Sequence, residues 1–361
     1  MLDLPTALAL SLVSGRARPT LVARLRDRWP DVLSPGRDRT CPSLGTLIAT
    51  VQPECDDPAG LAGTLQRRAQ KALARVDSSL ATPLQLGEPG YPRLLAAIHD
   101  PPLVLWVRGD VRALDHPSVA IVGARAASPA GLEVARRLGR DLAAAGLVVV
   151  SGLARGVDAS AHVGALEGGR TVAVLGSGVD VIYPPDNREL AERLCGNGAV
   201  LSELPPGSPP CAHHFPQRNR IISGLSLAVI VVEAAAKSGS LITAACALDQ
   251  GREVMAVPGN ALAGRNRGAH ALIRDGARLV ETAQDVLDEL GLAPCVHPSE
   301  PAAEPEERLL ALMPAGEAVD LESLAALSGV PTPMLLGRLT ELELSGCVAR
   351  APGGRFVRLG R

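Results

Sequence analysis

Aromatic side chains are scarce in this sequence, which has two Phe, two Tyr and two Trp among its 361 residues. So few rings exclude a binding surface made of many stacked aromatic side chains. An excess of one charge is also missing, because the formal net charge is −2. Any affinity for a polyanion would therefore have to come from a local patch of the surface.

Lysine is nearly absent, with Lys71 and Lys237 as its two occurrences, so Arg supplies almost all of the positive charge. Genomic base composition accounts for the abundant Arg, Ala, Gly and Pro, and the Arg excess by itself indicates no function. The 7 Cys are scattered without a Cys-x-x-Cys pair, which argues against a zinc site or disulfide framework and favours a cytoplasmic protein. No apolar stretch approaches the ~18 residues of a membrane span and no signal pattern opens the chain, so we expect no membrane insertion.

The chain is long enough for several domains, and its composition, 47% hydrophobic and 20% charged, is that of a globular protein. We expect a helical N-terminal domain over residues 1–80 and an extended Rossmann-like α/β core over 84–292. A linker rich in Pro, Ala and Glu over 293–305 precedes a winged-helix domain over 306–361.

The N-terminal domain is expected to contain helices over Ala7–Val13, Thr20–Trp29 and Leu61–Val76. The first two flank Gly15 as in a SAM-like domain or a degenerate helix–hairpin–helix, which would contact a DNA backbone. The alternative, which we prefer, is a small packing domain without a ligand.

In the core, short apolar runs alternate with segments of helical periodicity, a pattern that predicts a doubly wound parallel sheet with helices on both faces. The runs are Val119–Val122, Leu147–Val150, Thr171–Leu175, Ala199–Leu201, Leu227–Val232 and Glu253–Val257. Ser128 and Pro129 form an N-cap and N1 pair that starts the first helix. Ligands of such sheets bind beyond the carboxyl ends of the strands, where the glycine-containing loops of this sequence lie.

The first of these loops contains no Gly-x-Gly-x-x-Gly, and Ser151-Gly152 follows the second run in place of an acidic residue. We therefore expect no nicotinamide or flavin cofactor. Asp158 and His162 stand four residues apart, and a structural pair is preferred over an acid–base pair. His213-His214 has no partner ligands at metal spacing and is expected on an extended segment, so no metal site is expected.

No catalytic motif is present in the sequence: there is no nucleophile elbow, no Walker loop and no cluster of carboxylates. The most informative stretch runs from Phe215 to Thr243. It places an aromatic ring and two Arg before a buried strand, and a Ser-Gly-Ser turn at a helix start after it. Guanidinium groups and a helix N-terminus suit phosphate, and a ring suits a base.

In the C-terminal domain we expect helices over Glu306–Met313, Leu321–Leu327 and Pro333–Leu344, followed by a hairpin around Pro352–Gly354. This is the pattern of a winged helix, a module that often reads DNA. Its third helix carries Glu341 and Glu343, so a role in protein interaction or packing is at least as well supported.

Taken together, these motifs resemble the bacterial DNA-processing protein DprA family, also called Smf. The matching segments are Val122–Arg125, Ser151–Asp158, Ala161–His162, Tyr183–Pro184 with Asn187, Ser202–Glu203, Phe215–Arg220, Ser238–Thr243, Gly251–Val254, Val257–Gly259 and Gly276–Ala277. The resemblance is strong over residues 85–290 and architectural at both ends.

The resemblance implies a non-enzymatic homodimer that binds single-stranded DNA, protects incoming strands and loads the recombinase RecA during natural transformation. The implied DNA-binding residues are Gly123, Arg125, Gly152, Arg155, Phe215, Arg218, Asn219, Arg220, Lys237, Ser238, Gly239, Ser240 and Thr243. Ala124 departs from the family, in which many members have Ser. Because few rings accompany Phe215, we expect binding to be driven by phosphate contacts and weakened by salt.

Two alternatives remain open. Nucleotide phosphoribohydrolases have a related sheet, but their catalytic glutamate has no counterpart between Ser238 and Cys246. A winged-helix regulator that reads duplex DNA would keep its specificity after mutation of the sheet site.

Overall fold

The computed structural model describes residues 2–13, 20–33, 41–76, 80–261, 264–293, 309–310, 312–313, 318–328, 330–344, 347–351 and 354–358. The chain forms two compact units, Met1–Cys295 and Val296–Arg361, which are described separately. None of the helices in the described ranges is both long and apolar enough to cross a membrane.

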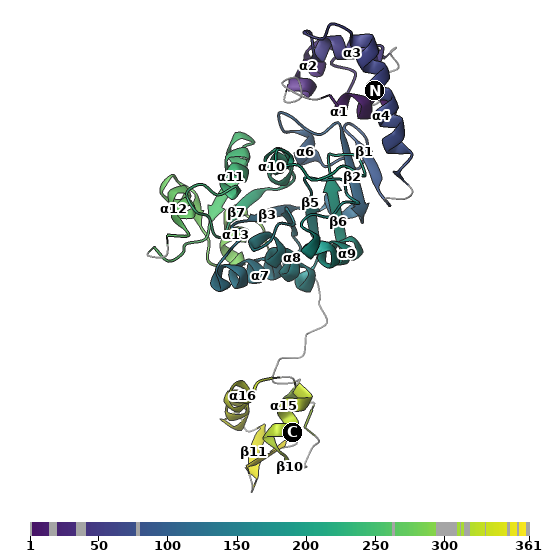
Figure 1. Cartoon of the computed structure of the whole chain (residues 1–361). Coiled ribbons are helices and arrows are strands. Elements are labelled where there is room, and N and C mark those ends of the chain that lie inside the picture. Colours follow the sequence, from purple (N-terminus) through teal and green to yellow (C-terminus); the bar gives the residue numbers. More distant parts are fainter. Residues whose placement is uncertain are drawn as a thin grey trace. The chain divides into compact units, whose positions relative to one another are not determined.

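A nine-stranded sheet lies at the centre of the first unit, with the strand order β1-β2-β6-β5-β4-β3-β7-β8-β9 (Figure 1). The strands are β1 Thr82–Gln85, β2 Val104–Gly109, β3 Ser118–Val122, β4 Val148–Ser151, β5 Thr171–Val174, β6 Gly198–Ser202, β7 Ala228–Val231, β8 Glu253–Ala256 and β9 Arg278–Leu279. Strands β3 to β9 pair in parallel. Strands β1 and β2 extend the sheet beyond β6 as antiparallel neighbours.

Helices cover both faces of this sheet, so the expected doubly wound α/β fold is confirmed. Apolar side chains of α7 (Pro129–Ala144), α8 (Val157–Gly168) and α13 (Ala283–Leu290) share one core with one face of the strands. The opposite core receives side chains from α10 (His214–Leu225), α11 (Ser240–Asp249) and α12 (Arg267–Arg274). Figure 1 shows α7 and α8 below the strands and α10 and α11 above them. The remaining segments are α6 (Arg93–Ala96), α9 (Arg188–Gly196) and the 3-10 turns η2 (Val111–Asp115) and η3 (Pro185–Asn187).

The start of α7 is fixed to the end of β7. The Ser128 hydroxyl accepts a hydrogen bond from the Gly131 amide at 3.1 Å and donates one to the carboxylate of buried Glu233 at 2.7 Å. Ser128 is thus the N-cap and Pro129 the first helical residue, as expected from the sequence. This contact joins the strand that ends at the candidate site to the helix layer on the opposite face.

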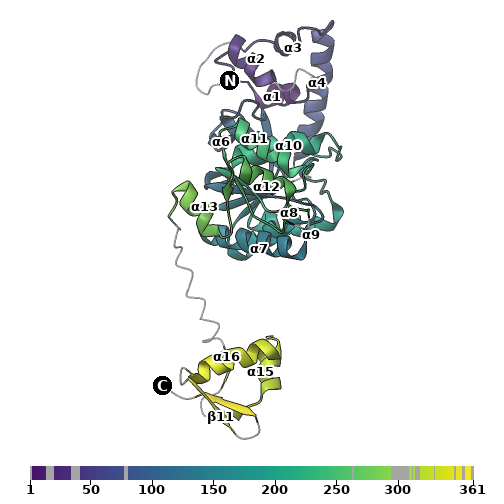
Figure 2. The same ribbon diagram turned by 90° about the vertical axis from the view of Figure 1, so that its left-hand side faces the viewer.

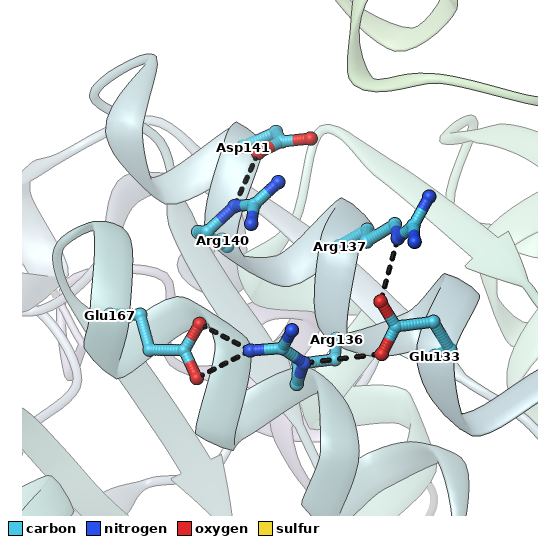
Figure 3. A network of polar contacts seen from close by, with 6 residues as sticks. All are labelled: Glu133, Arg136, Arg137, Arg140, Asp141 and Glu167. Atoms are coloured by element: carbon cyan, nitrogen blue, oxygen red, sulfur yellow. Dashed lines mark hydrogen bonds and ion pairs between the residues drawn. The ribbon is translucent and has the colours of Figure 1, made fainter. Parts of the chain in front are cut away.

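The exposed surface of α7 and α8 carries a network of ion pairs (Figure 3). Arg136 lies between Glu133 of its own helix and Glu167 of α8, and Arg137 pairs with the same Glu133 at 2.7 Å. Arg140 pairs with the adjacent Asp141 at 2.8 Å. Such exposed pairs each stabilise a fold by at most about 1 kcal/mol. Because each guanidinium in the network faces a carboxylate, the network adds no excess positive charge to this face.

The N-terminal helices are α1 (Leu4–Ser11), α2 (Leu21–Arg28), α3 (Leu44–Val51) and α4 (Pro58–Leu73). Helix α3 was not expected from the sequence; it begins at the N-cap Ser43, whose hydroxyl accepts the Thr46 amide at 3.2 Å. The Gly15 turn lies outside the described residues. The buried Gln85 amide donates to the Leu2 carbonyl at 2.6 Å and joins this domain to the sheet.

The second unit is a small α/β module. Strands β10 (Ala318–Val319), β12 (Arg355–Arg358) and β11 (Val348–Ala351) form a sheet in that order beside α15 (Leu321–Ser328) and α16 (Thr332–Leu344). The expected hairpin is confirmed, with Val348 opposite Arg358, and Phe356 and Leu339 belong to its core. Most of the expected linker 293–305 and helix 306–313, and the turn residues Pro352 and Gly353, lie outside the described residues.

Candidate functional site

The candidate site lies where the direction of the sheet reverses. The chain runs outward from β3 through β4, β5 and β6, and then returns to place β7 on the other side of β3. Ligands of open α/β sheets bind at such a switch point, outside the carboxyl ends of the strands. A cavity of about 410 Å³ lies there, between the loops after β3, β4 and β7 and the first turns of α10. Of the expected residues it is lined by Gly123, Arg125, Phe215, Arg218, Asn219, Ser238, Gly239, Ser240 and Thr243.

Arg218 of α10 supplies a buried cation to this cavity, with a side chain that leaves the residue only 8% exposed. Its Nη1 donates a short hydrogen bond to the Val174 carbonyl at the end of β5. The guanidinium lies against Gly152, where a Cβ atom would come within 1.9 Å of Nη1, so any other residue at 152 would displace the guanidinium. Burial lowers the pKa of Arg218 to about 10. The group therefore stays charged at neutral pH.

Asp158, in the first turn of α8, is buried beneath the cavity and holds the loop after β4. Its carboxylate accepts the amides of Gly152 at 3.1 Å and Ala154 at 3.4 Å. Burial raises the pKa of Asp158, while the nearby Arg218 charge opposes that shift. The structural role expected for Asp158 agrees with these contacts.

His162 does not partner Asp158 as expected, because its fully buried Nδ1 lies 2.7 Å from the Thr171 hydroxyl of β5. Burial lowers the pKa of His162 to about 3, so the ring is neutral across the physiological range. The imidazole therefore belongs to the packing between α8 and the sheet.

Two aromatic rings stand at the mouth of the site. The Phe215 and Tyr183 centroids are 5.6 Å apart with the planes inclined by 42°, and Tyr183 is 44% exposed. The exposed Arg125 guanidinium lies 5.7 Å from the Phe215 centroid. The expectation that little besides Phe215 is available for stacking is therefore wrong. From the sequence, the loop that contains Tyr183 is expected to shape the wall of the site, but not to supply a ring for stacking. A ring in a chain with so few aromatic residues was the available signal.

The turn after β7 brings a helix N-terminus to the cavity. Helix α11 begins at Ser240 without an acidic residue in its first turn, and the Ser238 and Ser240 hydroxyls are 2.7 Å apart. The Asn219 amide donates to the Gly239 carbonyl at 3.5 Å, which ties the turn to α10. The first amides of the helix already have partners, because Ser240 N–H donates to the Ser238 hydroxyl at 3.3 Å and Leu241 N–H to the Ser238 carbonyl at 3.1 Å. The helix dipole and the two hydroxyls are the features of this start that favour an anion.

Four expected residues do not line this cavity. Gly152 and Arg155 line an adjoining cavity of about 280 Å³, which shares Arg125, Phe215 and Arg218 with the first. Arg155 pairs with Asp186 at 2.6 Å. Lys237 is exposed one residue before the turn and lines neither cavity.

Arg220 is the clear departure from expectation. Its guanidinium contacts Asp100 at 3.0 Å and Glu203 at 2.7 Å, and the side chain is only 15% exposed. Burial alone would lower the pKa of Arg220, but the two carboxylates outweigh it and raise the pKa. Because Arg218 and Arg220 stand two positions apart on a helix, their side chains point to different faces. The structure therefore does not bring Arg220 to the cavity.

The expected extended segment at His213 is also wrong, because His213 is the N-cap of α10 and His214 its first residue. The two rings lie 4.3 Å apart. Within the described ranges, no group of His, Cys, Asp and Glu side chains forms a metal site.

Comparison with known families shows which family this chain belongs to. The family model described as DNA recombination-mediator protein A matches residues 82–291. The chain belongs to this family. The model of the DprA winged helix domain matches residues 293–354, which assigns the second unit.

Curated members of the DNA recombination-mediator protein A family are similar to much of the chain. Protein Smf of Escherichia coli is 43% identical over 284 residues, which cover 75% of each chain. DNA processing protein DprA of Streptococcus pneumoniae is 48% identical over 200 residues, which cover 55% of this chain and 71% of that relative.

Solved structures of the family have the same fold. The X-ray structure of DNA processing protein A from Streptococcus pneumoniae superimposes with a TM-score of 0.69 at 36% identity, over 80% of this chain and 99% of that one. DNA processing protein A from Helicobacter pylori, a protein with a unique single-stranded DNA binding mode, gives a TM-score of 0.53 at 32% identity. It covers 58% of this chain and 95% of its own. These comparisons identify a DNA-processing recombination mediator.

Proposed function

We propose that this recombination mediator binds single-stranded DNA in the cavity between β3, β7 and α10. The observation that carries the proposal is the meeting of three kinds of group around one cavity. Arg125 and Arg218 provide positive charge, Phe215 and Tyr183 provide rings, and the start of α11 provides the positive end of its dipole with the Ser238 and Ser240 hydroxyls. The Helicobacter pylori relative, which binds single-stranded DNA, supports the proposal.

In the proposed complex, phosphates lie against Arg125 and the start of α11, and a base stacks on the exposed side of the Tyr183–Phe215 pair. Arg218 contributes a fixed charge from below, because its guanidinium is held by the Val174 carbonyl. Rings and phosphate donors of this kind recognise unpaired bases of any sequence. The preference for single strands follows, since a duplex keeps its bases stacked inside.

The residues lining the cavity do not favour the phosphoribohydrolase alternative. Among the described lining residues the one carboxylate is Asp158, and its oxygen is already bound to two amides of the loop after β4. It is thus built as a loop anchor rather than a group that attacks a glycosidic bond.

The proposal extends to the loading of RecA, the protection of incoming strands in natural transformation, and a homodimer working in the cytoplasm. Family membership supports these steps. Light scattering at micromolar concentration tests the dimer, and RecA filament formation on strands already coated by a single-strand binding protein tests the loading.

The binding itself is tested by fluorescence anisotropy of a labelled poly-dT oligonucleotide at two salt concentrations, against a matched duplex. We expect tight single-strand binding that weakens with salt. Arg125→Ala should weaken it about tenfold, the loss expected for one charge-assisted phosphate contact. Arg137→Ala, which removes an exposed Arg from the ion-pair network on α7, is the matched control.

Equal affinity of the wild-type protein and Arg125→Ala for poly-dT would exclude this cavity as the binding site. Tighter binding to the duplex would favour the winged-helix alternative. In that case, deletion of the second unit should abolish binding while Arg125→Ala leaves it unchanged.

A further inference from the structure

A larger cavity lies on the other side of the start of α10. It measures about 740 Å³ and is lined by the end of α1, by α4, and by the loop of residues 204–209. His213, His214 and Gln217 complete the lining. In Figure 2 the lower part of α4 lies beside α10, in agreement with the cavity that both line.

The wall that α4 contributes is cationic. Arg68 and Lys71 stand three positions apart, so they lie on one face of α4, and Arg75 follows just beyond the end of the helix. All three side chains are exposed. Lys71 is one of the two lysines of the whole chain. None of the described residues that line this cavity is an Asp or a Glu. Arg68 and Lys71 therefore bring positive charge to this wall of the cavity.

This cavity is shaped by close packing between the N-terminal helices and the α/β core. Nη1 of Arg75 lies 3.4 Å from the Pro206 carbonyl, which it approaches as a donor. Gly207 has a φ of +80°, and a Cβ atom there would come within 1.8 Å of the same Nη1. Arg75 thus anchors the end of α4 to the loop, and Lys71 and Arg68 stand about one and two helical turns before it.

The two cavities flank a single helical turn. His214 and Gln217 line the α4 side, while Phe215 and Arg218 line the candidate site. The first turn of α10 carries no acidic residue. A helix with its side chains is only about 10–12 Å wide, so a strand that leaves the Phe215 ring and crosses the start of α10 reaches the cationic cavity within about that distance.

We propose that the α4 cavity is a second contact for the same nucleic-acid strand, in which Arg68 and Lys71 bind its phosphates. This inference rests on the proposed function of the first cavity and extends it. The second cavity has no Phe, Tyr or Trp among its described lining residues. Its contacts are therefore with phosphates, independent of sequence and sensitive to salt.

The test compares the double variant Arg68→Ala/Lys71→Ala with the wild-type full-length chain on two poly-dT lengths. A strand of ~6 nucleotides, near the lower end of known site sizes, fills the first cavity, and one of ~20 nucleotides reaches both. Arg67→Ala/Arg193→Ala is the matched control, because both of these exposed arginines lie outside the lining of either cavity. Thermal unfolding checks that each variant is folded.

We expect the Arg68→Ala/Lys71→Ala variant to bind the short strand like the wild type and the long strand about tenfold more weakly. The slope of log affinity against log salt should become shallower by about 1.4 on the long strand, from two lost contacts at ~0.7 each. Unchanged affinity and slope on the long strand would overturn the inference. Failure of Arg125→Ala to weaken binding to either strand would instead refute the proposed function, so the two failures are distinguishable.

Discussion

Replacing Arg220 by Ala tests whether this residue belongs to the binding site or to the fold. In the structure its guanidinium joins Asp100 and Glu203, both of which are mostly buried, and it faces away from the candidate cavity. The substitution would remove the guanidinium from two carboxylates that are mostly shielded from water. We therefore expect a loss of stability and only a secondary effect on DNA binding.

The size of this loss follows from the burial of the partners. Removing one partner of a buried ion pair costs about 3–5 kcal/mol. Because side-chain exposures of 15%, 20% and 11% leave some access to water, we expect the lower end, about 3 kcal/mol. With an unfolding entropy of about 2.1 cal/mol/K per residue over the unit Met1–Cys295, that corresponds to a fall in Tm of about 5 °C.

Urea and thermal unfolding, with Arg137→Ala as the exposed control, measure this effect. Adding Asp100→Asn/Glu203→Gln to Arg220→Ala should recover part of the lost stability, because neutral amides then replace the two buried carboxylates. An Arg220→Ala protein with unchanged Tm and strongly reduced affinity for poly-dT would refute the reasoning and return Arg220 to the site.

Three further predictions concern the site. Phe215→Ala should weaken single-strand binding by about 1–3 kcal/mol in an anisotropy titration, with a comparable loss for Tyr183→Ala; no loss in either would exclude stacking. Gly152→Ala should displace the Arg218 guanidinium and weaken both binding and stability, the latter by about 1–3 kcal/mol in urea; an unchanged protein would contradict the close packing described above. The pKa of about 3 for buried His162 lies below the usual 6.5, so the unfolded chain takes up its proton first, and stability falls as the pH drops from 6.5 towards 3. His162→Gln should reduce the slope of the unfolding free energy against pH in this range, by up to ~1.4 kcal/mol per pH unit. An identical slope in the variant would show that other groups dominate.

The sheet could be predicted because each of its central strands is a short apolar run bounded by glycine or polar residues. Val119–Val122 and Leu227–Val232 are examples, and both became adjacent parallel strands. The loops after them followed from the rule that ligands bind at the carboxyl ends. Arg125 and the Ser238–Ser240 turn therefore meet at one cavity.

The features that could not be predicted from the sequence depend on helical phase and on contacts between distant segments. The sequence shows two arginines around Asn219, but only the start of α10 at His214 determines that Arg218 faces the cavity and Arg220 faces away. Tyr183 reaches Phe215 from a loop that lies more than thirty positions earlier in the chain. Helix α3 went undetected because its apolar residues follow a stretch rich in Pro, Gly and Arg, where no helical signal is strong.

The anchoring of Arg218 has a consequence for the free energy of binding. A free arginine side chain populates many rotamers, and a ligand that fixes it pays for their loss, about 2 kcal/mol of entropy. Here that ordering takes place during folding, because the Val174 carbonyl and the glycine at 152 leave the guanidinium one position. An arriving phosphate meets a charge that is already oriented, while the exposed Arg125 still has to be ordered. In the proposed complex, Arg218 is thus a charge with a fixed position and Arg125 one that adapts to the ligand.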